Sequence, residues 1–233
     1  MSEKILVVDD EKEIADLLEV YLKNEGYEVY KSYNAADAFE CVKKNEIDLA
    51  LLDVMLPDIS GFEICEKIRE KYKFPVIMLT AKVGEADQIN GLMIGADDYI
   101  TKPFRPLEVL ARVKAQLRRY KTYSIENKEE QSDEVIAKSD FVLNVDTHIV
   151  TLNGIPLNVT PTEFSILRIL LEHYGKVVSA EELFHELWED EYYTKSNNTI
   201  TVHIRHLREK MGEIVENPNY IKTVWGVGYK IED

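Results

Sequence analysis

Short runs of apolar residues alternate with longer amphipathic stretches over residues 1–120. Unbroken runs of Val, Ile and Leu are typical of strands that are buried on both faces of a sheet. In the stretches between these runs, apolar residues recur every three to four positions, which is the period of a helix. Strands are expected at 4–8, 27–31, 48–52, 75–79 and 98–101, and helices at 14–22, 35–44, 62–71, 86–94 and 107–119. These five strand-then-helix units predict an α/β domain with a five-stranded, parallel, doubly wound sheet.

The pattern changes after residue 120. Residues 121–134 are polar, carry charges of both signs and have no apolar period, so we expect a linker. In residues 135–233, alternation at 141–145, 148–152 and 155–159 predicts a small antiparallel sheet with a hairpin turn at Asn153-Gly154. Helical periods follow at 161–174, 179–188 and 196–211, and two short strands surround Gly226-Val227-Gly228. This order predicts a second domain of the winged helix-turn-helix class.

Composition limits the classes of protein to which the chain can belong. The 233 residues carry a net charge of −15 and 45% of them are hydrophobic, which is typical of a globular protein. The charge speaks against a protein that coats nucleic acid indiscriminately. No apolar run approaches the roughly 20 residues needed to span a bilayer, and the N-terminus lacks the pattern of a signal peptide. The two cysteines, Cys41 and Cys65, form no disulfide framework, so we expect a cytoplasmic protein.

Polar side chains gather at the ends of the strands of the first domain. Asp9 and Asp10 end the first strand, Asp53 ends the third, Thr80 ends the fourth, and Lys102 follows the fifth. Because the carboxyl ends of parallel strands meet at one edge of a sheet, we expect these residues to converge. Three adjacent carboxylates would retain a proton unless a cation held them. Carboxylate oxygens suit a hard divalent ion, and we therefore expect Mg²⁺.

The same residues indicate the chemistry of this site. A nucleotide-binding site would need a glycine-rich loop after the first strand, where this chain has acids. A carboxylate can attack phosphorus to form an acyl phosphate, with Asp53 as the nucleophile and Lys102 and Thr80 contacting phosphoryl oxygens. A magnesium-dependent phosphatase or phosphotransferase acting on small molecules is the alternative. It would lack the acid two residues after Asp53, and it leaves the second domain unexplained.

The strand-end residues, in this order and spacing, resemble the flavodoxin-like receiver domain of two-component response regulators. The resemblance implies that Asp53 accepts phosphate from a sensor histidine kinase. It implies that the Lys102-Pro103 bond is cis and that Thr80 and Tyr99 are switch residues, with Thr80 moving toward the phosphoryl group. It also implies four magnesium ligands: Asp10, Asp53 and the Met55 carbonyl directly, and Asp9 through water.

The stretch 196–211 has the pattern of a DNA-recognition helix. One apolar stripe is formed by Ile200, Ile204, Leu207 and Met211. The remaining surface, rich in Thr, Val, His and Arg, suits the major groove. From Lys195 to Lys210 there are four bases and one acid, although the second domain as a whole is acidic. A local basic surface of this kind predicts specific binding with a strong dependence on salt.

The second domain resembles the winged-helix effector domain of the OmpR/PhoB family in three stretches, VTPTEFSILRILLEHYGKVVSAEELFHELW, NTITVHIRHLREKM and YIKTVWGVGYKI. The resemblance implies that double-stranded promoter DNA and RNA polymerase are partners. By it, the base-reading residues are Thr199, Thr201, Val202 and His206. The phosphate-binding residues are His203, Arg205, Arg208 and Lys222, and the wing tip, Trp225-Gly226, approaches the minor groove. Family members often carry Arg at the positions of His206 and Trp225, so base preference does not transfer directly.

A self-complementary set of charges predicts a dimer. It consists of Asp97, Asp98, Glu108, Arg112, Lys114 and Arg119. In the family this surface forms a two-fold homodimer after phosphorylation, so we expect Asp98 to pair with Arg112, and Asp97 with Arg119, across the interface.

The expected function is that of a phosphorylation-switched transcription factor, not of an enzyme, although the receiver would assist its own phosphorylation and dephosphorylation. Within the family, the sequence most resembles those of the regulators of vancomycin resistance, and this resemblance implies activation of resistance genes. Two alternatives stay open. One is a transcription factor of the same type that serves another cell-envelope stress regulon. The other is a constitutive DNA-binding protein whose receiver no longer responds.

Overall fold

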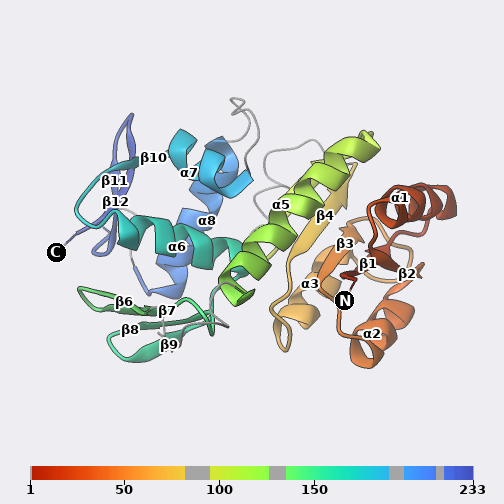
Figure 1. Cartoon of the computed structure of the whole chain (residues 1–233), viewed down its shortest axis with the longest axis horizontal. Coiled ribbons are helices and arrows are strands. Elements are labelled where there is room, and N and C mark those ends of the chain that lie inside the picture. The colour runs from red at the N-terminus through yellow and green to blue at the C-terminus, as the bar shows by residue number, and fades with distance from the viewer. Residues whose placement is uncertain (1, 82–94, 126–134, 189–196, 214–217, 233) are drawn as a thin grey trace. The chain divides into compact units, whose positions relative to one another are not determined.

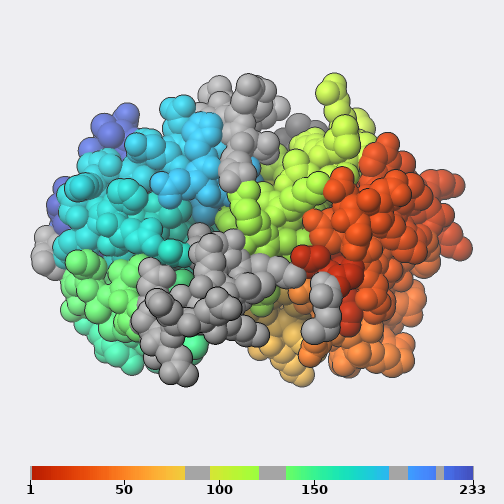
Figure 2. Space-filling view, viewed as in Figure 1, coloured from red at the N-terminus to blue at the C-terminus, as the bar shows by residue number. Residues whose placement is uncertain are grey.

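The computed structural model describes residues 2–81, 95–125, 135–188, 197–213 and 218–232. The chain divides into two compact units, Met1–Leu117 and Arg118–Asp233, whose elements are labelled in Figure 1. In Figure 2 the visible surface of the first unit is formed mainly by the chain up to α2 and by α5. Within the described residues, no helix combines the length and the apolar character that crossing a bilayer requires.

The first unit is built on the predicted parallel sheet. Its strands are β1 (Lys4–Val8), β2 (Glu28–Ser32), β3 (Leu49–Asp53), β4 (Val76–Thr80) and β5 (Asp98–Thr101), in the order β2-β1-β3-β4-β5. Successive residues of β1 point to opposite faces, so that Leu6 and Val8 enter one core cluster and Ile5 and Val7 enter another. The two covered faces explain why the strands are continuously apolar, and the predicted fold class is confirmed.

Helices cover both faces of this sheet (Figure 1). Their bounds are α1 (Lys12–Asn24), α2 (Ala35–Lys44), α3 (Gly61–Arg69) and α5 (Pro106–Ile125). Residues of α2 and α3 pack in one core cluster, and residues of α1 and α5 pack in the other. The side chains of Asn34 and Ser60 cap α2 and α3 by accepting from backbone N–H groups of the first turn. The helix expected at 86–94 lies outside the described residues.

Helix α5 runs to Ile125 and therefore enters the predicted linker, 121–134. The residues KTYSI contain no glycine or proline to end the helix. The rest of the linker, 126–134, lies outside the described residues.

The second unit opens with a four-stranded antiparallel sheet, β6 (Val135–Lys138), β7 (Phe141–Asn144), β8 (Ile149–Leu152) and β9 (Ile155–Leu157), in that spatial order. Asn153 and Gly154 form the predicted hairpin turn with positive φ values of 53° and 76°. Strand β6 was not predicted, because its residues are mostly exposed and carry no clear alternation.

Three helices and a second sheet complete the unit. The elements are α6 (Pro161–Glu172), β10 (Val178–Ser179), α7 (Ala180–Trp188), α8 (Asn197–Lys210), β11 (Ile221–Val224) and β12 (Gly228–Ile231). The three strands lie in the order β10-β12-β11, and the hairpin of β11 and β12 is the predicted wing. Gly228 allows this close packing, because a Cβ atom there would lie 2.0 Å from the Val178 carbonyl oxygen. The two-residue strand β10 gave no signal in the sequence.

Candidate functional sites

The structure brings the three predicted acids of the first unit together. Ligand oxygens of Asp9, Asp10 and Asp53 all lie within 4.8 Å of one another. Asp9 and Asp53 are buried at the ends of β1 and β3, whereas Asp10 is exposed. Strands β1 and β3 are hydrogen-bonded neighbours, so their final residues must lie side by side. The parallel topology therefore produces the acid cluster, which we define as Asp9, Asp10 and Asp53.

Lys102 lies among these carboxylates. Its Nζ atom is 2.8 Å from Asp9 Oδ2, 2.9 Å from Asp53 Oδ2 and 3.4 Å from Glu11 Oε1. Burial alone would lower the pKa of the Lys102 ammonium, but the hydrogen bonds to Asp9 and Asp53 outweigh burial and raise it. The Lys102-Pro103 peptide bond is cis, as the resemblance implies.

The acid cluster keeps an excess of negative charge even with Lys102 in place. Burial raises the pKa of Asp9, partly offset by the hydrogen bond from Lys102. One ammonium cannot neutralise three carboxylates and the nearby Glu11. The donor set is made of carboxylate oxygens, which fits a hard divalent cation.

Backbone groups hold two of the carboxylates in position. The Glu11 N–H donates to Asp9 Oδ1 at 3.0 Å, and the Met55 N–H donates to Asp53 Oδ1 at 3.1 Å. Each carboxylate thus bonds to the backbone two residues further on, which fixes its orientation. The other oxygen of each, Oδ2, is the one that Lys102 contacts.

The two predicted switch residues lie on β4 and β5. Thr80 is buried at the end of β4, beside Thr101 of β5. Tyr99 packs against the core on the side of α2 and α3, and burial raises the pKa of its hydroxyl. Among the described residues this hydroxyl has no hydrogen-bond partner.

In the second unit, the face of α8 differs from the predicted one. Thr201 and Arg205 are exposed and Thr199 is half-buried. The apolar stripe is buried as expected. Four further residues predicted to face DNA are also buried: Val202, His203, His206 and Arg208. The buried surface of α8 is therefore wider than one stripe.

Two of these buried side chains lie beside polar groups of neighbouring elements. His206 Nδ1 lies 3.9 Å from Glu163 Oε1 of α6, and burial lowers the pKa of His206. Arg208 donates through Nε and Nη2 to the Ile221 carbonyl and through Nη2 to Thr223 Oγ1, both on β11. The assumption that charged and imidazole side chains on α8 face solvent was wrong for these two residues, because both are buried within the domain. Arg208 has partners on β11, whereas Nε2 of His206 has no hydrogen-bond partner among the described residues.

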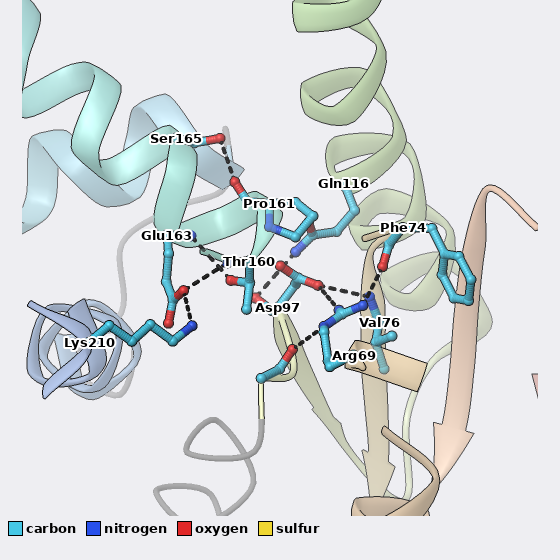
Figure 3. Close-up of polar contacts among 11 residues, drawn as sticks. Arg69, Phe74, Val76, Asp97, Gln116, Thr160, Pro161, Glu163, Ser165 and Lys210 are labelled. Atoms are coloured by element: carbon cyan, nitrogen blue, oxygen red, sulfur yellow. Dashed lines mark hydrogen bonds and ion pairs between the residues drawn. The ribbon is translucent and has the colours of Figure 1, made fainter. Parts of the chain in front are cut away.

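Glu163 is a buried carboxylate whose role the sequence did not reveal. It forms a capping box with Thr160 at the start of α6, in which its Oε2 accepts from the Thr160 N–H at 2.8 Å. The same oxygen accepts from Lys210 Nζ at 2.5 Å, and Figure 3 shows this contact reaching across to α8. Glu163 thus holds α8 against the N-terminus of α6.

The wing presents a different surface. Trp225 is 91% exposed at its tip, and Gly226 adopts a φ of +74° in the turn. Lys222 is half-buried and its Nζ atom is 3.4 Å from Glu232 Oε1. The predicted wing-tip residues are therefore accessible to a ligand.

Comparison with known proteins identifies the family. Residues 5–114 match the response regulator receiver domain, and residues 154–231 match the domain described as transcriptional regulatory protein, C terminal. The chain is 67% identical to regulatory protein VanR of Enterococcus faecium and 52% identical to regulatory protein VanRc of Enterococcus gallinarum, each over 232 residues and 100% of both chains. The chain belongs to the OmpR/PhoB family of response regulators. Among solved structures, this regulator resembles response regulator DrrB, a Thermotoga maritima OmpR/PhoB homolog, with a TM-score of 0.53, 34% identity and 100% coverage of both chains.

The family establishes the general function. The chain is a response regulator that controls transcription, and its two domains imply a histidine kinase and promoter DNA as partners.

Gly61 is a residue of the receiver that sequence reasoning missed. A Cβ atom at this position would lie 2.0 Å from the Asp53 carbonyl oxygen. The Gly61 N–H also donates to the Val54 carbonyl at 3.1 Å. The absence of a side chain therefore lets α3 begin directly against the end of β3, beside the acid cluster. The only available signal was a glycine at a helix start, following a good capping residue, Ser60.

Asp97 lies in an internal network of the receiver and not on its surface (Figure 3). Its Oδ2 atom accepts from Arg69 Nη2 at 2.6 Å and from the Val76 N–H at 2.9 Å. Arg69 also donates to the carbonyls of Gly95 and Phe74. The predicted pairing of Asp97 with Arg119 across a dimer would require Asp97 to leave this network, in which Arg69, at the end of α3, is its partner.

The other predicted interface residues also have partners within the chain. Arg112 Nη1 lies 3.0 Å from Asp98 Oδ2, and Arg112 Nε lies 3.6 Å from Glu108 Oε1. Arg119 is buried in the second unit, where it donates to the Leu187 carbonyl and lies 4.8 Å from the centre of the Trp188 ring. Pairing across a dimer would require each of these side chains to exchange partners.

Proposed function

We propose that Asp53 accepts a phosphoryl group from a sensor histidine kinase of the VanS type, and that this modification brings two copies of the regulator together on promoter DNA. The observation that carries the proposal is the excess of carboxylates over cations at the ends of β1 and β3. The resulting complex would recruit RNA polymerase in the cytoplasm. By its likeness to regulatory protein VanR, the regulator would activate vancomycin-resistance genes.

In the proposed reaction, an oxygen of Asp53 forms a bond to phosphorus while the bond from phosphorus to the kinase histidine breaks, and the histidine nitrogen keeps the electron pair. The Lys102 ammonium, which lies 2.9 Å from Asp53 Oδ2 in the unphosphorylated protein, would donate to a phosphoryl oxygen instead. The Thr80 hydroxyl at the end of β4 would donate to another. Asp9 stays oriented by the Glu11 N–H.

Mg²⁺ fits this donor set. Asp10, Asp53 and the Met55 carbonyl would hold the ion directly, and Asp9 would hold it through water. When bound, Mg²⁺ neutralises charge on the phosphoryl oxygens, which the single ammonium of Lys102 cannot do alone.

The proposed homodimer uses the surface around β5 and α5. Asp98, Glu108 and Arg112 would exchange their contacts within one chain for the same contacts across the two-fold axis. Asp97 and Arg119 would first have to leave Arg69 and Leu187 respectively. An exchange of similar ion pairs contributes little net free energy. A nearly complete switch requires about 5.5 kcal/mol, so apolar contacts or relief of repulsion at Asp53 must supply most of it.

The proposed DNA surface consists of the exposed and half-buried residues of α8 and the wing. Thr199 and Thr201 would read bases, Arg205 and Lys222 would bind phosphates, and Trp225-Gly226 would approach the minor groove. Val202 and His203 would have to become exposed before they could contact DNA.

The experiment that tests this function is footprinting of genomic promoter DNA with and without a phosphoryl donor, using wild-type protein, Asp53→Asn and the matched surface variant Glu40→Gln. Glu40 is an exposed acid of α2 that forms an ion pair with Lys44 and is not part of the acid cluster. The donor should strengthen the footprint of wild type and Glu40→Gln and leave Asp53→Asn unchanged. An equal footprint for all three proteins, regardless of donor, would identify a constitutive DNA-binding protein.

A further inference from the structure

The recognition helix and the wing are joined by side-chain hydrogen bonds at two places. Near the C-terminus of α8, the Arg208 guanidinium bonds to the Ile221 carbonyl through Nε at 3.1 Å and through Nη2 at 2.5 Å. Its Nη2 also lies 2.8 Å from Thr223 Oγ1. Near the N-terminus of α8, Thr201 Oγ1 lies 3.2 Å from the Tyr229 hydroxyl of β12. Both strands of the wing are therefore tied to the helix.

The geometry of Arg208 differs from that of a phosphate-binding arginine. The residue is only 6% exposed, and two of its three nitrogens already bond to neutral acceptors on β11. Neighbouring Arg205, by contrast, is exposed and lies beside Glu209 at 2.9 Å. The planar guanidinium donates to the Ile221 carbonyl through two nitrogens at once, a forked geometry that the single ammonium nitrogen of a lysine cannot reproduce.

The acceptors on β11 are also informative. Ile221 and Thr223 pair with Ile231 and Tyr229 of β12, so Arg208 contacts the strand that carries the proposed phosphate ligand Lys222. The Ile221 carbonyl accepts from the guanidinium, and a bond of this kind fixes the backbone of the strand and not merely a side chain. Displacement of Arg208 would therefore shift the whole hairpin, including its exposed tip at Trp225.

We infer that Arg208 is a positioning residue that sets the wing against the recognition helix, so that the two DNA-contacting elements meet the duplex as one rigid surface. This positioning role takes the place of the phosphate-binding role that the family resemblance implies for Arg208. The inference depends on the proposed DNA contacts of the wing only for the effect of Arg208 on DNA affinity. The hydrogen bonds from Arg208 to β11, which we call the brace, exist in the DNA-free protein.

The test uses full-length protein with Arg208→Lys, Arg208→Met and Thr223→Val, and with Arg205→Met as the matched control. Amide hydrogen exchange of residues 221–224 is measured without DNA. Loss of hydrogen bonds of this kind should accelerate exchange there about fivefold to tenfold in both Arg208 variants and about threefold in Thr223→Val. Arg205→Met should leave exchange in the wing unchanged.

DNA affinity is then measured over a range of salt concentrations. The inference predicts that Arg208→Lys fails to restore affinity although it keeps the charge, and that Thr223→Val weakens binding with an unchanged salt slope. Arg205→Met should reduce the slope by about 0.9. The inference would be overturned if amide exchange in the wing were unchanged in the Arg208 variants and Arg208→Lys bound DNA with the affinity of wild type. Arg208 would then be assigned to phosphate binding.

If Arg208→Met does not fold, Arg208→Lys and Thr223→Val decide the question. If the wing exchanges faster but DNA affinity stays the same, the proposed DNA contact of the wing fails while the brace stands.

Discussion

The two units treat buried charge in different ways. In the receiver, the acid cluster gathers three carboxylates around a single ammonium, that of Lys102. In the second unit, the buried carboxylate of Glu163 has Lys210 and a backbone N–H as partners, and buried Arg208 has a carbonyl and a hydroxyl. One region keeps an excess of one sign of charge, whereas the other supplies partners for Glu163 and Arg208 from within.

This difference separates a binding site from a framework. A buried charge is costly unless it is paired, so an uncompensated excess persists only where a ligand of opposite sign completes it. Matched groups instead hold elements together, as Glu163 holds α6 to α8. The receiver should therefore respond to Mg²⁺ and to removal of Lys102, whereas the second unit should respond only to loss of its own partners.

The largest effect is expected from Lys102→Met. Removal of the Lys102 ammonium takes away the cation that contacts both Asp9 and Asp53, which should lower the free energy of unfolding of the receiver by about 3 kcal/mol without metal. Excess Mg²⁺ should restore much of this loss. Thermal unfolding in EDTA and in Mg²⁺ gives the measurement, and a variant that is equally stable in both conditions would contradict the proposed cation site.

A smaller loss is expected from Gly61→Ala. The added Cβ would lie against the Asp53 carbonyl oxygen, so that either α3 or the end of β3 must move, at a cost of about 1–3 kcal/mol. Phosphorylation of Asp53 should become slower. The control is Gly175→Ala, where open space surrounds the new methyl group and only a positive φ of +77° is strained. Equal phosphorylation rates for the two variants would show that Gly61 does not position the phosphoacceptor.

Glu163→Gln tests the matched charges of the second unit. The amide can still accept from the Thr160 N–H but loses the ion pair with Lys210, which should cost about 1 kcal/mol. Unlike Lys102→Met, this variant should gain no stability from Mg²⁺. Denaturant unfolding with and without the ion makes the comparison, and rescue by Mg²⁺ would remove the distinction between the two regions.

The smallest effect is a pH dependence from His206. Burial lowers the pKa of this imidazole in the folded state, against the attraction of Glu163, so the unfolded chain takes up a proton first as the pH falls. The contribution of His206 to stability should be fully present above about pH 6.5 and decline below it. Arg205, Glu209 and Lys210 on the same helix also influence this group. Urea unfolding from about pH 5 to 8 should show a weaker pH dependence for His206→Gln than for wild type.

The sequence revealed more of the acid cluster than of the DNA surface. In a parallel sheet the chain direction alone places Asp9, Asp53 and Thr80 at one edge, so position along each strand suffices to predict that they meet. No such rule fixes the face of α8. Whether His206 and Arg208 point inward depends on Glu163 and on the carbonyl of Ile221, which belong to other elements.

The same reasoning explains the remaining differences. The sequence did not show that Asp97 has a partner within the receiver, because that partner, Arg69, lies on α3 and is far from Asp97 along the chain. Asp97 was therefore predicted to pair across a dimer. Strands β6 and β10 escaped prediction because pairing with β7 and β12, and not an apolar pattern, defines them. Features set by chain direction were predictable, whereas features set by a single tertiary contact were not.

The central claim is that the acid cluster uses Mg²⁺ to make Asp53 a phosphoryl acceptor. Mass spectrometry of the intact protein and its peptides, after incubation with acetyl phosphate in Mg²⁺ or in EDTA, tests it most directly. The predicted result is one phosphoryl group on Asp53, formed only with Mg²⁺ and missing in Asp53→Asn. A wild-type protein that stays unmodified in Mg²⁺, or an Asp53→Asn variant that is modified to the same extent, would contradict it.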